Sequence, residues 1–163
     1  MNDIDGQTLL LVEDNEDDVF IFKRAYRQAQ VAHPLQVVND GEEAFDYLTG
    51  GGVFADRAKY PLPFLVLLDL KLPFKGGLEV LQAIRETPAL AQLCVVVLTS
   101  SAEERDIARA RELRAQAYLV KPPSAATLKE ILAAVRARLA GQERLPGIAG
   151  DFFADEAGAG PVG

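Results

Sequence analysis

Short apolar runs alternate along the chain with longer segments in which apolar residues recur every three or four positions. The short runs have the length and the Val/Leu-rich composition of strands that are buried on both faces of a parallel sheet. They predict strands at 8–12, 35–39, 64–68, 94–98 and 117–120. The longer segments predict helices at 17–30, 40–49, 77–86, 101–114 and, after 121–123, up to Leu139. Two of the helix starts, at Asp40 and Ser101, carry Glu three positions later, as in a capping box.

The succession of five strand–helix pairs predicts an α/β fold. We expect a flavodoxin-like (βα)5 doubly wound sandwich with a parallel five-stranded sheet in the order 2-1-3-4-5. Segment 50–63 is rich in Gly and Pro and is predicted to be an unusually long loop. Residues 7–140 are expected to form the domain, and 141–163 a flexible C-terminal tail with too few residues for a second domain.

Polar residues follow four of the predicted strands, at the edge where ligands bind in a doubly wound sheet. Glu13 and Asp14 follow the first strand, Asp69 the third, Thr99 the fourth and Lys121 the fifth. Clustered carboxylates repel one another, and Mg2+, which prefers oxygen ligands, would relieve this repulsion. A lysine and a hydroxyl beside them would bind an anion. Asp69 is therefore a candidate nucleophile toward a phosphoryl donor.

Each of these residues taken alone has a simpler explanation. The acids at 16–18 are expected to stabilise the N-terminus of the helix that follows the first strand. Thr99 alone would be a turn residue, and Lys121 alone a surface lysine. Only the whole set, at four neighbouring strand ends, favours a functional site.

The composition narrows the classes of function and location. A net charge of −7 argues against a nucleic-acid partner, which would require a basic face. The sequence shows no signal peptide and no apolar run of about 18 residues, so we expect a cytoplasmic protein without a membrane partner. The single cysteine, Cys94, is expected to be a small core residue. The single histidine, His33, is expected at the surface.

Four motifs, in this order, resemble those of the response-regulator receiver domain of two-component signalling. They are LLLVEDN, LLDLKLP, VVVLTSS and YLVKPP. Thr99 lies 30 residues after Asp69 and Lys121 lies 52 residues after it, which are the intervals that receivers show between phosphoacceptor, hydroxyl and lysine. The resemblance covers residues 7–140.

The resemblance implies that Asp69 accepts a phosphoryl group from a phosphohistidine of a sensor histidine kinase. It also implies an Mg2+ (or Mn2+) cofactor at this residue. The other protein ligands would be Asp14 directly, Glu13 through water, and the backbone carbonyl of Lys71. Glu13 stands where many receivers have Asp. The chain would catalyse only its own phosphorylation and dephosphorylation, and is not expected to be an enzyme in any other sense.

The resemblance further implies a switch. Thr99 and Lys121 would contact the phosphoryl group, and Tyr118 would swing inward when Thr99 moves. This reshapes the face formed by the fourth helix, the fifth strand and the fifth helix. Lys71 and Ser101 occupy positions that tune dephosphorylation, and whether Lys71 hinders the attacking water or helps to hold the anion stays open.

Two narrower expectations concern partners and backbone. The long loop with GVFADR resembles that of single-domain receivers that partner phytochrome-type sensor kinases. Only 23 residues follow Ala140, so output is expected through another protein, through phosphate shuttling, or through a homodimer that uses the same helix–strand–helix face. The Lys121–Pro122 peptide bond is expected to be cis, as in the family.

Two other classes of function compete with this hypothesis. The first is an Mg2+-dependent phosphohydrolase with Asp69 as its nucleophile, although such enzymes carry a second acid where this chain has Lys71. The second is a docking adaptor that works without phosphate, which would not require the full set of site residues.

Overall fold

The structure is a computed structural model that describes residues 6–100 and 103–140. Strands and helices alternate in this part of the chain, as the apolar pattern predicts. The elements are β1 (Leu9–Val12), α1 (Glu16–Gln28), β2 (Leu35–Val38), α2 (Gly41–Thr49), a short 3-10 helix (Gly52–Phe54), β3 (Leu65–Asp69), α3 (Gly77–Glu86), β4 (Cys94–Thr99), α4 (Glu104–Glu112), β5 (Ala117–Val120) and α5 (Ala125–Leu139). The predicted tail at 141–163 lies outside the described residues.

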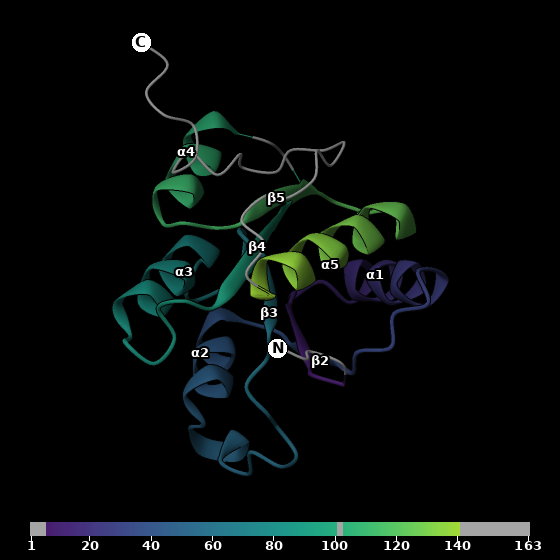
Figure 1. Ribbon diagram of the computed structural model, residues 1–163. Coiled ribbons are helices and arrows are strands. Elements are labelled where there is room, and N and C mark those ends of the chain that lie inside the picture. Colours follow the sequence, from purple (N-terminus) through teal and green to yellow (C-terminus); the bar gives the residue numbers. More distant parts are fainter. Residues whose placement is uncertain (1–5, 101–102, 141–163) are drawn as a thin grey trace.

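The five strands form one parallel sheet in the order β2-β1-β3-β4-β5, which confirms the flavodoxin-like prediction. Helices α1 and α5 cover one face of the sheet, and α2, α3 and α4 cover the other (Figure 1). Because successive side chains of a strand point to opposite faces, each central strand contributes to both cores. Leu10 and Val12 pack with α2 and α3, whereas Leu9 and Leu11 pack with α1 and α5.

The central strands are apolar up to their last residues because both of their faces are buried. All five residues of β3 and all six of β4 are buried. Each fully buried Leu or Val contributes about 1.5–3 kcal/mol relative to an exposed one. Strand β3 extends one residue further than the apolar run predicts, so Asp69 is its last residue. The core therefore holds this carboxylate at a fixed place on the sheet edge.

Side-chain caps begin three of the helices. The Asn15 side chain accepts a hydrogen bond from the Asp18 amide at 3.0 Å, and Ser124 caps α5 in the same way. Asp40 accepts from the Glu43 amide at 2.8 Å, which confirms that part of the predicted capping box. Helix α4 begins at Glu104, after the predicted start at Ser101, a residue outside the described part of the chain.

The predicted long loop at 50–63, after α2, contains the short 3-10 helix and is held in place by hydrogen bonds and aromatic packing. Arg57 donates hydrogen bonds to the carbonyls of Tyr47 and Leu48, at the C-terminus of α2, and to the carbonyl of Tyr60. The rings of Tyr47, Phe54 and Tyr60 pack against one another with centroids 5.1–6.0 Å apart. The Arg57 guanidinium thus pairs the Leu48 carbonyl and adds a second donor to the Tyr47 carbonyl, which also accepts from the Gly50 amide.

The prediction of a surface position for His33 is wrong. Only 6% of the residue is exposed. Its ring packs against that of Phe64 in a tilted arrangement, with ring centroids 4.5 Å apart. Nδ1 lies 3.0 Å from the Gln7 carbonyl oxygen, and Nε2 lies 3.3 Å from the Arg136 guanidinium. The loop before β2 folds over the amino-terminal edge of the sheet, and this tertiary packing buries the ring. Cys94 is buried in β4, as predicted.

Among residues 6–100 and 103–140, no helix is both long enough and apolar enough to cross a bilayer.

Candidate functional site

The backbone hydrogen bonds of the sheet continue past the strand ends and bring the predicted site residues to one edge. The Glu13 amide donates to the Val38 carbonyl at 3.0 Å, directly after β1. The Lys121 amide donates to the carbonyl of Thr99, the last residue of β4, at 2.8 Å. Since Asp69 ends β3, which lies between β1 and β4, the side chains of all four strand ends meet there.

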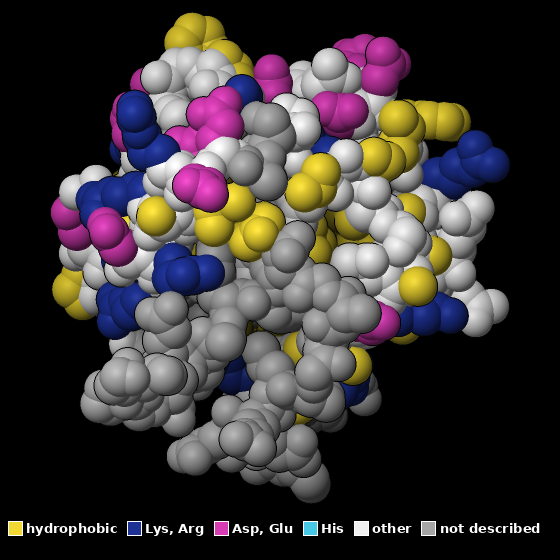
Figure 2. All heavy atoms as spheres, turned by 90° about the horizontal axis from the view of Figure 1, so that it is seen from above, with side chains coloured by type: hydrophobic (Ala, Val, Ile, Leu, Met, Phe, Trp, Pro, Cys, Tyr) yellow, Lys and Arg dark blue, Asp and Glu magenta, His cyan; other side chains and the backbone are white. Residues whose placement is uncertain are grey.

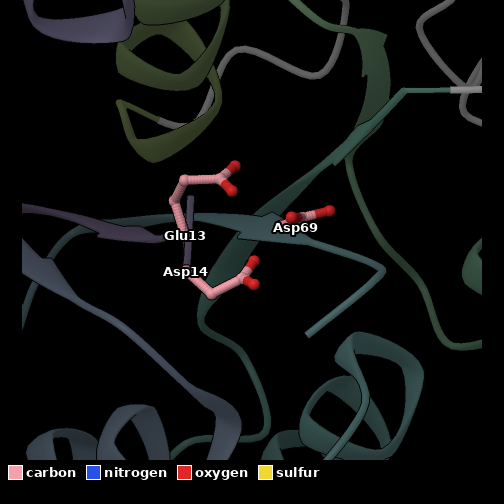
Figure 3. Close-up of side chains that lie close together, drawn as sticks. All are labelled: Glu13, Asp14 and Asp69. Atoms are coloured by element: carbon pink, nitrogen blue, oxygen red, sulfur yellow. The ribbon is translucent and has the colours of Figure 1, made fainter. Parts of the chain in front are cut away.

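Three carboxylates gather at this edge. One oxygen from each of Glu13, Asp14 and Asp69 lies within 4.8 Å of the other two. Figure 3 shows the Asp14 and Asp69 carboxylates reaching toward one region beside the end of β3. Glu13 and Asp69 are only 1% and 3% exposed, whereas Asp14 is exposed. The group thus combines two buried carboxylates with one that is accessible to solvent.

One ammonium offsets part of the negative charge of this group. Lys121 Nζ lies 2.8 Å from Glu13 Oε2, 3.0 Å from Asp18 Oδ2 and 3.2 Å from Asp69 Oδ2. Only 12% of its side chain is exposed. Burial by itself lowers the pKa of Lys121, but the hydrogen bonds to Glu13 and Asp18 and the charge of Asp69 outweigh burial and hold this pKa above its ordinary value. Lys121 therefore stays charged.

Glu13 is the carboxylate of the group whose pKa is raised. Burial and the neighbouring charge of Asp69 raise the pKa of Glu13 to about 7, against the lowering effect of hydrogen bonds from Lys121 and from the Asn15 amide. A carboxylate that ionises reluctantly beside two others gains from a nearby cation. The residues at this edge therefore fit a divalent cation with oxygen ligands.

Asp69 is oriented through both of its oxygens. Oδ1 accepts a hydrogen bond from the Lys71 amide at 3.0 Å, and Oδ2 accepts from Lys121. The start of α3 packs closely against the same strand end, because a Cβ added to Gly77 would overlap the Asp69 carbonyl oxygen and the Cα of Leu70. Only glycine leaves room for this approach.

The Lys71 side chain points to a different place from its amide. Its Nζ lies 3.8 Å from Glu103 Oε1, just before α4, and 58% of the side chain is exposed. The amide contact to Asp69 and this ion pair make Lys71 a link between the carboxylate group and the start of α4. Exposed ion pairs of this length contribute little to stability.

The two predicted switch residues lie on the same side of the sheet. Thr99 is buried at the end of β4. Tyr118, in β5, is half-buried and packs against the core beneath α3 and α4. The pairs Val97–Tyr118 and Thr99–Val120 set the register, so Thr99 and Tyr118 both face the layer of α3 and α4. The Lys121–Pro122 peptide bond is cis, as predicted. Ser101 lies outside the described residues.

Asp18 is the site residue that the sequence pattern did not single out. It was expected to serve only the N-terminus of α1, yet its carboxylate reaches Lys121 across the sheet edge. It stands four residues after Asp14, about one helical turn further along. That spacing was the available signal, but nothing in the sequence connects it to a lysine 103 residues away.

Comparisons with known proteins agree with this geometry. The pattern of the response regulator receiver domain family matches residues 9–133. The chain is 37% identical over 115 residues to response regulator Rcp1 of Synechocystis, which spans 71% of this chain and 76% of that protein.

Three solved structures are similar in fold and sequence. The bacteriophytochrome response regulator AtBRR is 41% identical, with a TM-score of 0.71 over 78% of this chain and 90% of that one. The phosphorylated cyanobacterial phytochrome response regulator RcpA is 35% identical, with a TM-score of 0.68 over 86% and 99%. The Mn2+-bound form of Rcp1 is 33% identical, with a TM-score of 0.67 over the same shares.

These similarities decide between the three hypotheses. They support a phosphoacceptor domain over a phosphohydrolase and over an adaptor that works without phosphate, since the match includes the whole acidic group. The carboxylates, together with a neighbour that holds Mn2+, point to binding of a divalent cation. The chain belongs to the response regulator receiver domain family and is homologous to phytochrome response regulators.

Proposed function

We propose that this protein accepts a phosphoryl group on Asp69 from a phosphohistidine of a sensor histidine kinase. The observation that carries the proposal is the position of Asp69 at a sheet edge beside Glu13 and Asp14, with its own carboxylate bonded to Lys121. Such a group combines a fixed nucleophile with an ammonium that can offset phosphoryl charge and with carboxylates that can hold a divalent cation.

The transfer is a single displacement. An oxygen of Asp69 forms a bond to phosphorus while the bond from phosphorus to the imidazole nitrogen of the donor breaks. That nitrogen keeps the bonding electron pair and takes up a proton from solvent water. Lys121 offsets charge on the phosphoryl oxygens, and the Thr99 hydroxyl donates a hydrogen bond to one of them. The Lys71 amide keeps Asp69 in position.

The proposed cofactor is Mg2+, with Mn2+ as a substitute. Asp14 and Asp69 would bind the cation directly, Glu13 through water, and the backbone carbonyl of Lys71 would be the remaining protein ligand. When bound, the cation supplies positive charge against the phosphoryl oxygens. A bound cation would favour the ionised form of Glu13 and so lower its raised pKa.

Phosphorylation would change the face formed by α4, β5 and α5. Thr99 moves toward the phosphoryl group, and Tyr118 takes an inward position under α4. Lys71 and Ser101 tune how long the phosphoryl group persists. Figure 2 looks onto the side where α4 and β5 lie and shows hydrophobic side chains among charged ones. Val120, on β5, is 45% exposed. This face supports a homodimer or a partner contact that depends on phosphorylation.

The remaining assignments follow from the relatives and the composition. A phytochrome-type sensor kinase is the proposed phosphoryl donor, because the similar proteins include phytochrome response regulators. The proposed receiver unit is 7–140, followed by a tail at 141–163, with a cytoplasmic location. A net charge of −7 disfavours nucleic acid and anionic membrane surfaces as partners. The protein has no proposed activity beyond its own phosphorylation and dephosphorylation.

The test is a two-dimensional 1H–15N NMR titration with beryllofluoride, a phosphoryl mimic, in the presence of Mg2+. We expect shifts at the strand ends and along α4 and β5 in the wild type, and none of these in Asp69→Asn. A wild type whose spectrum does not respond would contradict the proposed function.

A further inference from the structure

Lys121 uses its whole donor capacity on three carboxylates. A lysine ammonium has three N–H donors, and here they face Glu13, Asp18 and Asp69 at 2.8–3.2 Å. Two of these acceptors are buried and belong to the carboxylate group described above. The third, Asp18, lies on α1 and its side chain is 38% exposed. Any anion that joins this site must therefore take a donor away from an existing partner.

The carboxylate of Asp18 is not needed to begin α1. The helix is capped by the Asn15 side chain, which accepts from the backbone amide of Asp18 and leaves its carboxylate aside. Glu16 and Asp17 stand in the same first turn and already supply negative charge to the helix N-terminus. Asp18 instead lines, with Glu13 and Lys121, a small cavity between α1 and the segment after β5.

The charge of Asp18 acts against an incoming anion in two ways. It draws the Lys121 ammonium toward α1, and it repels negative charge that arrives beside Asp69. Glu13 and Asp69 share the first effect, but they also belong to the proposed cation ligands. Asp18 is the one of the three Lys121 acceptors that is not a proposed cation ligand. A bound cation would therefore not neutralise the charge of Asp18 as it would that of Glu13 and Asp69.

We propose that Asp18 is a positioning residue that competes with the phosphoryl group for Lys121. It holds the lysine in the unphosphorylated state and limits how tightly the site binds its anion. This inference rests on the proposed function and deepens it. Release of Lys121 from Asp18 then accompanies phosphorylation, which couples the site to the first turns of α1.

The expected size of the effect follows from Coulomb's law. Lys121 Nζ lies 3.0 Å from Asp18 and 3.2 Å from Asp69, so an anion beside Asp69 would lie about 6 Å from the Asp18 charge. Because the Asp18 side chain is 38% exposed, an effective dielectric constant between about 40 and 80 applies, and the charge changes a binding constant by between about threefold and tenfold. Asp18→Asn removes the charge and keeps an oxygen that can accept from Lys121. It should therefore tighten beryllofluoride binding by that factor without loosening the lysine.

The experiment measures the dissociation constant of beryllofluoride at saturating Mg2+, by 19F NMR of the bound anion, for three proteins. They are the wild type, Asp18→Asn and Asp17→Asn. Asp17 is a matched control because it is an exposed acid in the same helical turn, and none of the three bonds of Lys121 goes to it. Thermal unfolding of each protein reports whether either substitution changes the fold.

We expect Asp18→Asn to bind beryllofluoride between about threefold and tenfold more tightly than the wild type. The dissociation constant of Asp17→Asn should stay within about twofold of the wild-type value, because solvent and salt screen an exposed charge. An Asp18→Asn protein that binds like Asp17→Asn, or more weakly than the wild type, overturns the competition. A wild type that shows no bound anion would instead overturn the proposed function, so the two failures are distinct.

Discussion

Lys121 is the residue whose removal should most clearly expose the electrostatics of the site. Its ammonium faces two buried carboxylates, Glu13 and Asp69, in addition to Asp18. In Lys121→Met the side chain keeps its length but loses its charge, so the buried carboxylates repel one another without compensation. Removing one partner of a buried pair typically lowers the free energy of unfolding by about 3–5 kcal/mol. We expect the low end, about 3 kcal/mol, because Asp14 and Asp18 remain accessible to water.

The loss of unfolding free energy in Lys121→Met should be larger at high pH than at low pH. The pKa of Glu13 is already raised to about 7 with Lys121 present, and removing the ammonium raises it further. At about pH 8 the folded variant must either hold Glu13 as an unpaired buried charge or keep a proton on it, and both cost stability. At about pH 5.5 Glu13 is protonated in both folded proteins, and the repulsion falls. The difference from the wild type should shrink to about 1 kcal/mol at the lower pH. Adding Mg2+ at the higher pH should restore much of the loss, because the cation replaces the missing positive charge.

The assay is urea unfolding, followed by circular dichroism, at both pH values with EDTA or with Mg2+. Lys129→Met, an exposed lysine on α5, is the control for removing a lysine without removing these contacts. A loss that is equal at the two pH values and insensitive to Mg2+ would refute the charge argument. So would a variant of Lys121 that unfolds like the variant of Lys129.

Three further outcomes are expected. Gly77→Ala should lower the free energy of unfolding by about 2 kcal/mol or more, measured by thermal unfolding, because the added Cβ overlaps the Asp69 carbonyl. Gly76→Ala is the control in this assay, because its Cβ would meet nothing within 4 Å. Arg85→Gln should lose about 2–4 kcal/mol in urea unfolding and expose α4 amides to hydrogen exchange. The Arg85 guanidinium bonds four carbonyls at 2.7–3.0 Å, two just after α4 and two in the loop before β4, and so ties these segments together. In EDTA the free energy of unfolding should fall by up to about 3 kcal/mol as the pH rises from about 4.5 to 7, because the folded state keeps a proton on Glu13 that the unfolded chain has lost; Glu13→Gln should remove this slope.

The sheet could be predicted from sequence because its signal is local. Each central strand is a continuous apolar run, and the predicted strand 117–120 agrees with β5 at both ends. The carboxyl ends of parallel strands share one edge, so Asp69 and Lys121 could be expected to meet without any knowledge of their distance. The extension of β3 by one residue to include Asp69 could not be predicted, because a charged residue is taken as the end of an apolar run.

Three features of the structure could not be predicted, because they depend on contacts between residues far apart in the sequence. Asp18 looks like an ordinary first-turn acid, and its bond to Lys121 joins residues 103 positions apart. His33 precedes a proline in a loop and reads as a surface residue, yet Phe64 and Arg136 enclose it. Arg57 orders a Gly- and Pro-rich loop through carbonyls of α2. In each case a polar side chain finds its partner only after distant elements have packed.

The central claim is that Asp69 accepts the phosphoryl group. The most direct measurement is the intact mass of the protein after incubation with acetyl phosphate and Mg2+, followed by borohydride reduction and peptide mapping to locate the acyl phosphate. We expect the wild type to gain the mass of one phosphoryl group, the modified peptide to contain Asp69, and Asp69→Asn to gain none. A phosphoryl group on another residue, or an equal gain in Asp69→Asn, would contradict it.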